Sequence, residues 1–182
     1  MRVPRGTKGT LVTAGVIARM IADGAKDFYV RQKAIQIFRL SGIRPKDRWG
    51  EVNALFDWVK NNIRYTRDIF RVELLHSPRR MLELRAGDCD DMTMLLGAML
   101  IATGHPVRLV LVGFRHRKPH MYSHIYPEVN VQGRWVPIDA TVDRPIGWAP
   151  PAVWKRIYPV DVKSSQQSFK TKENALCSSR MR

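Results

Sequence analysis

Residues 86–100, AGDCDDMTMLLGAML, predict a loop that becomes an apolar helix, with Cys89 at the junction. Backbone N–H groups and the helix dipole favour negative charge at such a position, so they stabilise a thiolate, the reactive form of cysteine. We expect the helix over about residues 89–103, because Gly104 suits its C-terminal cap and Pro106 stops it. Cys89 is therefore a candidate nucleophile, although a lone cysteine is more often a small core residue.

Three acidic residues, Asp88, Asp90 and Asp91, surround this cysteine. We interpret them as N-terminal capping and first-turn charges of the helix, in preference to metal ligands. Their charges would raise the pKa of the thiol, so the helix dipole and a histidine must outweigh them if the thiol is activated. Nothing in the sequence resembles zinc-ligand spacing or a phosphate-binding loop, and we expect no metal and no cofactor.

The part of the chain before this motif is predicted to be largely helical. Apolar periodicity predicts helices over residues 11–23 and 26–41, which end at glycines, and over residues 48–62. A polar, arginine-rich connection over residues 64–85 leads from the third helix to the cysteine.

The part after it is predicted to form strands. VRLVLVGF, residues 107–114, is typical of a strand that is covered on both faces, and residues 115–120 form an exposed loop. Residues 121–131 and 134–141 flank Gln132-Gly133, an acceptable two-residue turn, and predict a hairpin.

The hairpin permits a geometric test. With the turn at residues 132–133, Asp139 lies opposite Tyr126, and His124 is its diagonal neighbour on the same face. The two side chains are then within hydrogen-bonding reach. Pro127 and Pro137 could introduce a bulge that shifts the register by one residue and separates the pair.

Cysteine, histidine and aspartate in this relation meet the needs of nucleophilic acyl transfer. The thiolate attacks a carbonyl, the imidazole moves the proton, and the carboxylate orients the imidazole. The backbone N–H of Cys89 is the first candidate for stabilising the oxyanion, and the Tyr65 hydroxyl is a second. Taken singly, His124 could be a core histidine and Asp139 could cap the turn at Thr141.

These segments resemble a known family. GDCDDMTMLLGAML and YSHIYPEVNVQGRWVPIDAT are similar to the blocks that carry Cys, His and Asp, in that order, in the transglutaminase-like (papain-like) cysteine superfamily. WVKNNIRYTRD and ELLHSPRRMLELRAGDC resemble small members from tailed-phage and prophage gene sets. The resemblance covers residues from about 11 to 145.

The resemblance implies an α+β fold, in which a helix bearing the cysteine packs against an antiparallel sheet. It also implies that Cys89 is the nucleophile, His124 the general base and acid, and Asp139 the orienting carboxylate. Calcium activation is not implied, because the chain lacks the extra β-domains of the animal crosslinking enzymes.

The expected organisation is one transglutaminase-like domain with two flanking segments. The domain covers residues 11–145, with a helical part at 11–62 and a catalytic core at 86–141. Residues 1–10 are expected to be a basic arm, and residues 146–182 a proline-containing, polar, basic tail.

The net charge of +15, from 31 Lys and Arg against 16 Asp and Glu, indicates a polyanionic neighbour. Eleven of the basic residues lie within residues 1–50. The two cysteines cannot build a disulfide framework, and Cys177 lies in the polar tail. We expect no transmembrane segment and no signal peptide, since Arg19 interrupts the only apolar stretch near the N-terminus.

The leading functional hypothesis is a phage-encoded cysteine enzyme that acts on amide bonds of proteins or peptidoglycan peptides, more by hydrolysis than by crosslinking. The alternative is a structural virion component, of head, neck or tail, that binds neighbouring subunits or DNA through its basic surface. The expected location is the virion or the host cytoplasm. A free nucleic-acid-binding module is a third hypothesis, but no recognised reading motif supports it.

Overall fold

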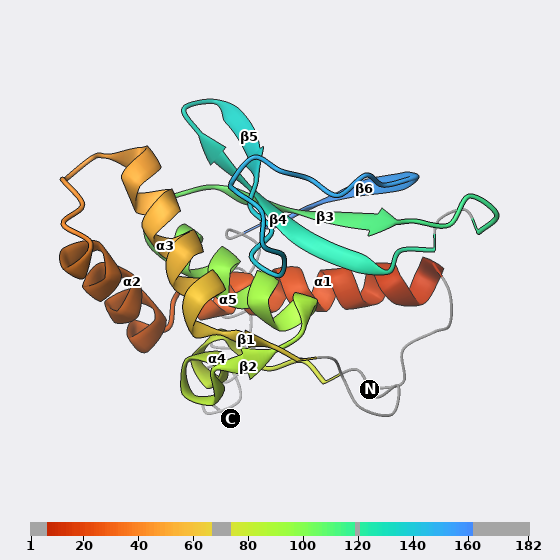
Figure 1. Cartoon of the computed structure of the whole chain (residues 1–182). Coiled ribbons are helices and arrows are strands. Elements are labelled where there is room, and N and C mark those ends of the chain that lie inside the picture. The colour runs from red at the N-terminus through yellow and green to blue at the C-terminus, as the bar shows by residue number, and fades with distance from the viewer. Residues whose placement is uncertain (1–6, 67–73, 119–120, 162–182) are drawn as a thin grey trace, which may run out of the picture.

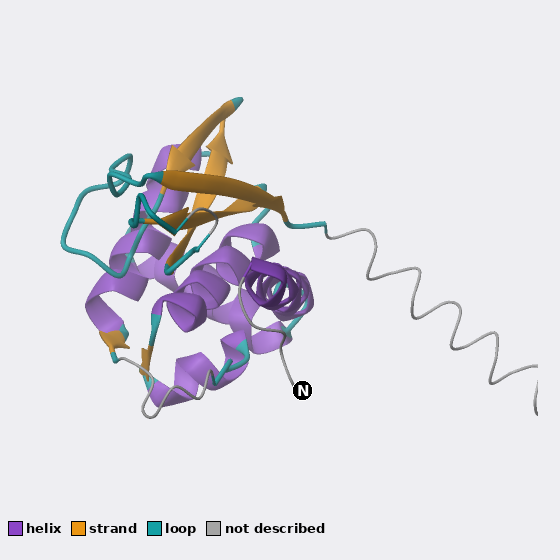
Figure 2. Ribbon diagram, turned by 90° about the vertical axis from the view of Figure 1, so that its right-hand side faces the viewer, coloured by secondary structure: helices purple, strands orange, loops and turns teal. Residues whose placement is uncertain are grey.

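A layer of helices covers one face of an antiparallel sheet in the computed structural model, which describes residues 7–66, 74–118 and 121–161 (Figures 1 and 2). The helices are α1 (Thr7–Gly24), α2 (Phe28–Leu40), α3 (Arg48–Asn62), α4 (Pro78–Leu84) and α5 (Cys89–Ala102). The strands are β1 (Arg64–Tyr65), β2 (Ala86–Gly87), β3 (Val107–Gly113), β4 (His124–Val131), β5 (Arg134–Pro137) and β6 (Trp154–Pro159). The expected α+β class is confirmed.

Helix α5 lies at the centre of the fold. Residues 90–100 are all buried, and the helix packs against the other four helices and against β4 (Figure 1). Its apolar side chains join two core clusters on the helical side of the sheet. Among the helices of the described ranges, none combines the length and hydrophobicity that a membrane span requires.

The main sheet has the strand order β5-β4-β3-β6, with neighbouring strands antiparallel. Strand β3 is buried apart from Arg108, as its apolar sequence predicts. Arg108 Nε donates to the buried Glu128 carboxylate at 2.7 Å, and Lys155 Nζ lies 2.9 Å from the other oxygen. This carboxylate therefore links β3, β4 and β6, and its two cations compensate its burial.

The hairpin has the predicted turn and register. Gln132 and Gly133 both have positive φ angles, 52° and 86°, as a two-residue hairpin turn requires. Val131 pairs with Arg134 and Glu128 with Pro137, so neither proline shifts the register. The N–H of Ile138 donates to Pro127 O at 3.0 Å, but Pro127 has no N–H to return, and the ladder ends there.

Three regions depart from the expectations. Helix α1 begins at Thr7, so the last part of the expected arm is helical, while residues 1–6 lie outside the described ranges. The expected polar connection over residues 64–85 contains β1 and α4, and β2 follows it. Ser77 caps α4 and Pro78 is its first residue, a helix-start signal within a polar segment. The helix predicted at 26–41 is shorter, at Phe28–Leu40.

Strand β6 is a further departure: it lies in the expected tail but pairs with β3 and therefore belongs to the domain. The prolines there argued against regular structure. An edge strand tolerates them, because one side of its backbone has no ladder to complete. Cys177 and the rest of the tail from residue 162 lie outside the described ranges.

Helix α1 approaches α4 and α5 closely at Gly24. A Cβ atom on Gly24 would lie 2.5 Å from Pro78 Cγ and 3.2 Å from Ala98 Cβ. Both neighbours are rigid, so an added methyl group must displace a helix.

We predict that Gly24→Ala destabilises the protein by about 1–3 kcal/mol in urea unfolding, because overpacking outweighs the gain in helix propensity of up to about 1 kcal/mol. In the double variant Gly24→Ala/Pro78→Ala, the cost of the first substitution should fall markedly. A stabilising Gly24→Ala, or a cost unchanged by Pro78→Ala, would contradict this packing.

Candidate active site

The start of α5 is fixed by its cap and by the small parallel sheet that precedes it. Asp88 is the N-cap and accepts from the N–H groups of Asp90 and Asp91 at 2.9 and 3.2 Å. Strand β2 pairs with β1 just before the cap, and Tyr65 lies beside Gly87 in that pair. The cap does not use the N–H of Cys89, which stays the first oxyanion candidate.

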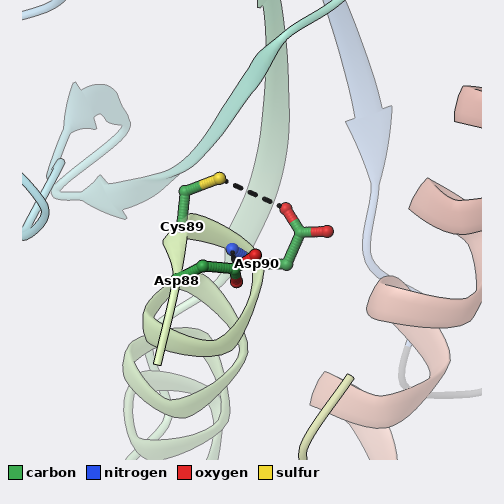
Figure 3. A group of neighbouring side chains, drawn as sticks. All are labelled: Asp88, Cys89 and Asp90. Carbon is green, nitrogen blue, oxygen red and sulfur yellow. Dashed lines mark hydrogen bonds between the residues drawn. The ribbon is translucent and has the colours of Figure 1, made fainter. Parts of the chain in front are cut away.

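The thiol of Cys89 points to the carboxylate of Asp90 (Figure 3), and Sγ lies 3.4 Å from Oδ1. Burial raises the pKa of Cys89 strongly, and the charges of Asp90 and Asp88 raise it further. A hydrogen bond from the backbone N–H of Ile125 lowers it, but by less. The expectation of a stabilised thiolate is therefore wrong for this resting state, in which the thiol is protonated and donates to Asp90.

The contact with Ile125 follows from the hairpin geometry. The carbonyl group of Pro127 points towards β5, where it accepts from Ile138 N–H. The backbone N–H and C=O of Ile125, two residues earlier in the strand, therefore point to the same side. Strand β5 ends at Pro137 and does not extend alongside Ile125. Side chains of α5 take its place, since the thiol of Cys89 accepts from Ile125 N–H and Thr93 Oγ1 donates to Ile125 O at 3.3 Å. The unfinished edge of β4 thus receives the first turns of α5.

His124 and Asp139 form the predicted hydrogen bond. His124 Nε2 lies 2.6 Å from Asp139 Oδ2, although Asp139 lies two residues beyond the end of β5. The other carboxylate oxygen accepts from Thr141 N–H at 3.0 Å and from Thr141 Oγ1 at 2.6 Å. Asp139 therefore both binds the imidazole and caps the turn, so the two readings of this residue hold together.

Burial raises the pKa of Asp139, but hydrogen bonds from His124 and Thr141 and the charge of His124 outweigh it, so that its pKa lies below the ordinary value of 3.8. The carboxylate is thus ionised at neutral pH and accepts a hydrogen bond from Nε2–H of the imidazole. His124 Nδ1 is left as the basic nitrogen. Cys89 contacts the backbone of Ile125, the residue after His124, so the thiol lies beside the end of β4 that carries His124.

Asp91 was expected to be a first-turn charge, but it binds a histidine that the sequence analysis did not single out. Its buried carboxylate accepts from the backbone N–H of His76 at 2.8 Å and lies 2.9 Å from His76 Nδ1. These bonds hold the segment before α4 to the first turn of α5. Gly87 packs so tightly here that an added Cβ would lie 2.7 Å from Asp91 Oδ2.

In the described ranges, the ligand atoms of Asp88, Cys89 and Asp90 lie within 4.8 Å of one another, the spacing of a potential metal site (Figure 3). Hydrogen bonds account for the arrangement without a cation. Asp88 serves as the helix cap, and Asp90 accepts from the thiol.

Comparison with known proteins gives a family match. The family model for the transglutaminase-like superfamily matches residues 39–140, a segment that includes Cys89, His124 and Asp139. No curated protein sequence matches the chain.

Several solved structures are similar to the chain. A candidate cysteine protease from Cytophaga hutchinsonii is 24% identical, with a TM-score of 0.48, over 62% of this chain and 37% of that one. A candidate protease from Parabacteroides distasonis is 15% identical, with a TM-score of 0.55, over 69% and 26%. A TGase is 14% identical, with a TM-score of 0.43, over 92% and 39%. The chain thus spans less than two fifths of each of these proteins.

We predict that Asp90→Asn lowers the pKa of Cys89, because one of the two anions that raise it is removed. The pH profile of iodoacetamide labelling at Cys89, read by mass spectrometry, should move to lower pH. Asp57→Asn, which removes an exposed carboxylate on α3, should leave the profile unchanged. An unmoved or raised profile in Asp90→Asn would show that Asp90 does not control the thiol.

A second prediction follows from the lowered pKa of Asp139. A carboxylate whose pKa is lowered by folding stabilises the fold above its unfolded pKa, and this contribution is lost as the pH falls through the folded pKa. The native protein should therefore exceed Asp139→Asn in urea stability at pH 7, and the difference should shrink below about pH 4. A difference that is constant from pH 7 to pH 3 would contradict the ionised pair.

Proposed function

The chain belongs to the transglutaminase-like superfamily, and we propose that it is a cysteine enzyme that cleaves amide bonds through a thioester on Cys89. The observation that supports this most directly is the bond of 2.6 Å from His124 Nε2 to Asp139. Because Nε2 makes this bond, Nδ1 of His124 is the nitrogen that can accept the thiol proton. The thiol of Cys89 contacts Ile125, the residue after His124 in β4.

The reaction begins when the thiol leaves Asp90 and donates to His124 Nδ1. The thiolate then attacks the amide carbonyl, and the resulting tetrahedral intermediate collapses as the C–N bond breaks. His124 returns its proton to the leaving amine, and Asp139 stabilises the imidazolium meanwhile. Water, with His124 again as base, hydrolyses the thioester and restores the thiol.

The oxyanion of the intermediate needs donors beside Cys89. The N–H of Cys89 suits this role because the cap leaves it unused, and we propose the Tyr65 hydroxyl as the second donor. The pairing of Tyr65 with Gly87, two residues before the cysteine, supports its assignment. Tyr65→Phe should then reduce kcat with little change in KM.

We propose hydrolysis in preference to crosslinking, and a tailed-phage or prophage origin. The motifs in residues 58–68 and 73–89 support the origin. The substrate is then a protein or a peptidoglycan peptide. The enzyme would act in the virion or in the host cytoplasm.

The experiment is a digestion of a proteome-derived peptide library in H₂¹⁸O, with a biotinylated primary amine present at millimolar concentration. The native chain should create carboxylates that carry ¹⁸O, whereas Cys89→Ala should create none. Asp139→Asn should reduce the rate by about 10³-fold or more, because the imidazole loses its orientation.

Biotin incorporation that exceeds ¹⁸O incorporation would show that the enzyme transfers the acyl group to amines in preference to water, and crosslinking would then replace hydrolysis as the proposed reaction. Equal product from the native chain and Cys89→Ala would remove the enzyme proposal altogether.

The net charge of +15 favours a second role, as a structural virion component that binds neighbouring subunits or DNA. Mass spectrometry of particles purified after prophage induction would detect the chain at a fixed copy number per particle. A chain that stays in the lysate and is missing from the particles would exclude this role.

A further inference from the structure

A basic groove lies between α2 and α4, away from the residues of the candidate active site. Its volume is about 600 Å³. Four cationic side chains line it: Lys33 and Arg39 from α2, Arg79 from α4, and Arg85 from the C-cap of α4. The acidic residue in the lining, Glu83, lies 2.6 Å from Arg80 and is already paired.

Aromatic rings hold three of these four cations in place. The guanidinium of Arg79 lies 4.1 Å from the ring centroid of Tyr29, and that of Arg85 lies 4.7 Å from the centroid of Trp58. Lys33 Nζ approaches the same Trp58 ring at 5.0 Å. A guanidinium stacked on a ring keeps its N–H edge free for a planar or tetrahedral anion.

No carboxylate within the described ranges forms an ion pair with any of the four cations. Burial lowers the pKa of Lys33, and the nearby charge of Arg85 lowers it further, as expected for like charges without a counter-ion between them. An anion in the groove would relieve this repulsion. The groove is therefore an electrostatic site for an anionic ligand.

Exposed aromatic side chains at one end of the groove indicate which anion. Phe28 and Tyr29 are 67% and 55% exposed, and their rings pack edge to face at 5.7 Å. Exposed rings beside a cationic groove are the two elements of a surface for single-stranded nucleic acid, since bases stack on the rings and phosphates bind the cations. An acidic peptide would use the cations and leave the rings without a role.

We propose that the α2–α4 groove binds single-stranded nucleic acid, with phosphates on Arg39 and Arg79 and a base on the Phe28–Tyr29 pair. Tyr29 and Arg39 are ten residues apart and span about 15 Å of helix, enough for a short run of about four nucleotides. This site uses no residue of the proposed catalytic set, and it stands or falls independently of the proposed enzyme activity.

The test is fluorescence anisotropy of labelled dT12 with the full chain over a series of salt concentrations. Arg39→Gln/Arg79→Gln should bind at least 10-fold more weakly than the native chain at low salt. It should also flatten the slope of log K against log salt by about 1.4, or about 0.7 per phosphate contact. The control Arg134→Gln/Arg156→Gln removes the same charge from exposed positions on β5 and β6 and should change neither quantity as much.

Two further measurements keep the proposal falsifiable. Phe28→Ala should weaken binding by roughly 5- to 100-fold without changing the salt slope, because it removes a stacked base and no charge. Thermal unfolding of each variant excludes loss of fold as the cause. Equal losses in the groove and control variants, or tighter binding of poly-glutamate with no effect of Phe28→Ala, would overturn the proposal, the latter in favour of an acidic peptide.

Discussion

The burial of α5 on every side is the constraint on which the rest of the structure depends. Four helices and β4 surround it, and each fully buried Leu or Met side chain contributes about 1.5–3 kcal/mol relative to exposure. A helix held in this way cannot turn or slide without unpacking several partners. Cys89, in the first turn of α5, is therefore fixed against the unpaired edge of β4. There the backbone N–H of Ile125 binds the sulfur, and His124 is the residue before Ile125.

The charges in the first turn of α5 oppose a thiolate at Cys89. The carboxylates of Asp88 and Asp90 favour a protonated thiol, and burial acts in the same direction. The thiol of Cys89 consequently donates to the carboxylate of Asp90, while the carboxylate of Asp139 binds and orients the imidazole of His124. A protonated thiol is protected from oxidation, which requires thiolate character.

Much of this could be predicted from the sequence where local chemistry dictates structure. Residues 132–133 fixed the turn, the turn fixed the register, and the register predicted the bond between His124 and Asp139. What escaped prediction depends on tertiary packing. The bond from Asp91 to His76 joins residues whose proximity no local pattern encodes, and β6 is a strand only because β3 offers it an edge.

The positions of the carboxylates in the fold add to the positive charge of the protein surface. Asp90, Asp91, Glu128 and Asp139 are all buried, and the last three are bound to histidine, arginine or lysine within the fold. They position α5, tie the strands together and orient His124. Because these four of the 16 acidic residues are buried, fewer carboxylates remain on the surface to balance the 31 basic residues. The resulting excess of cations creates a field that attracts polyanionic molecules.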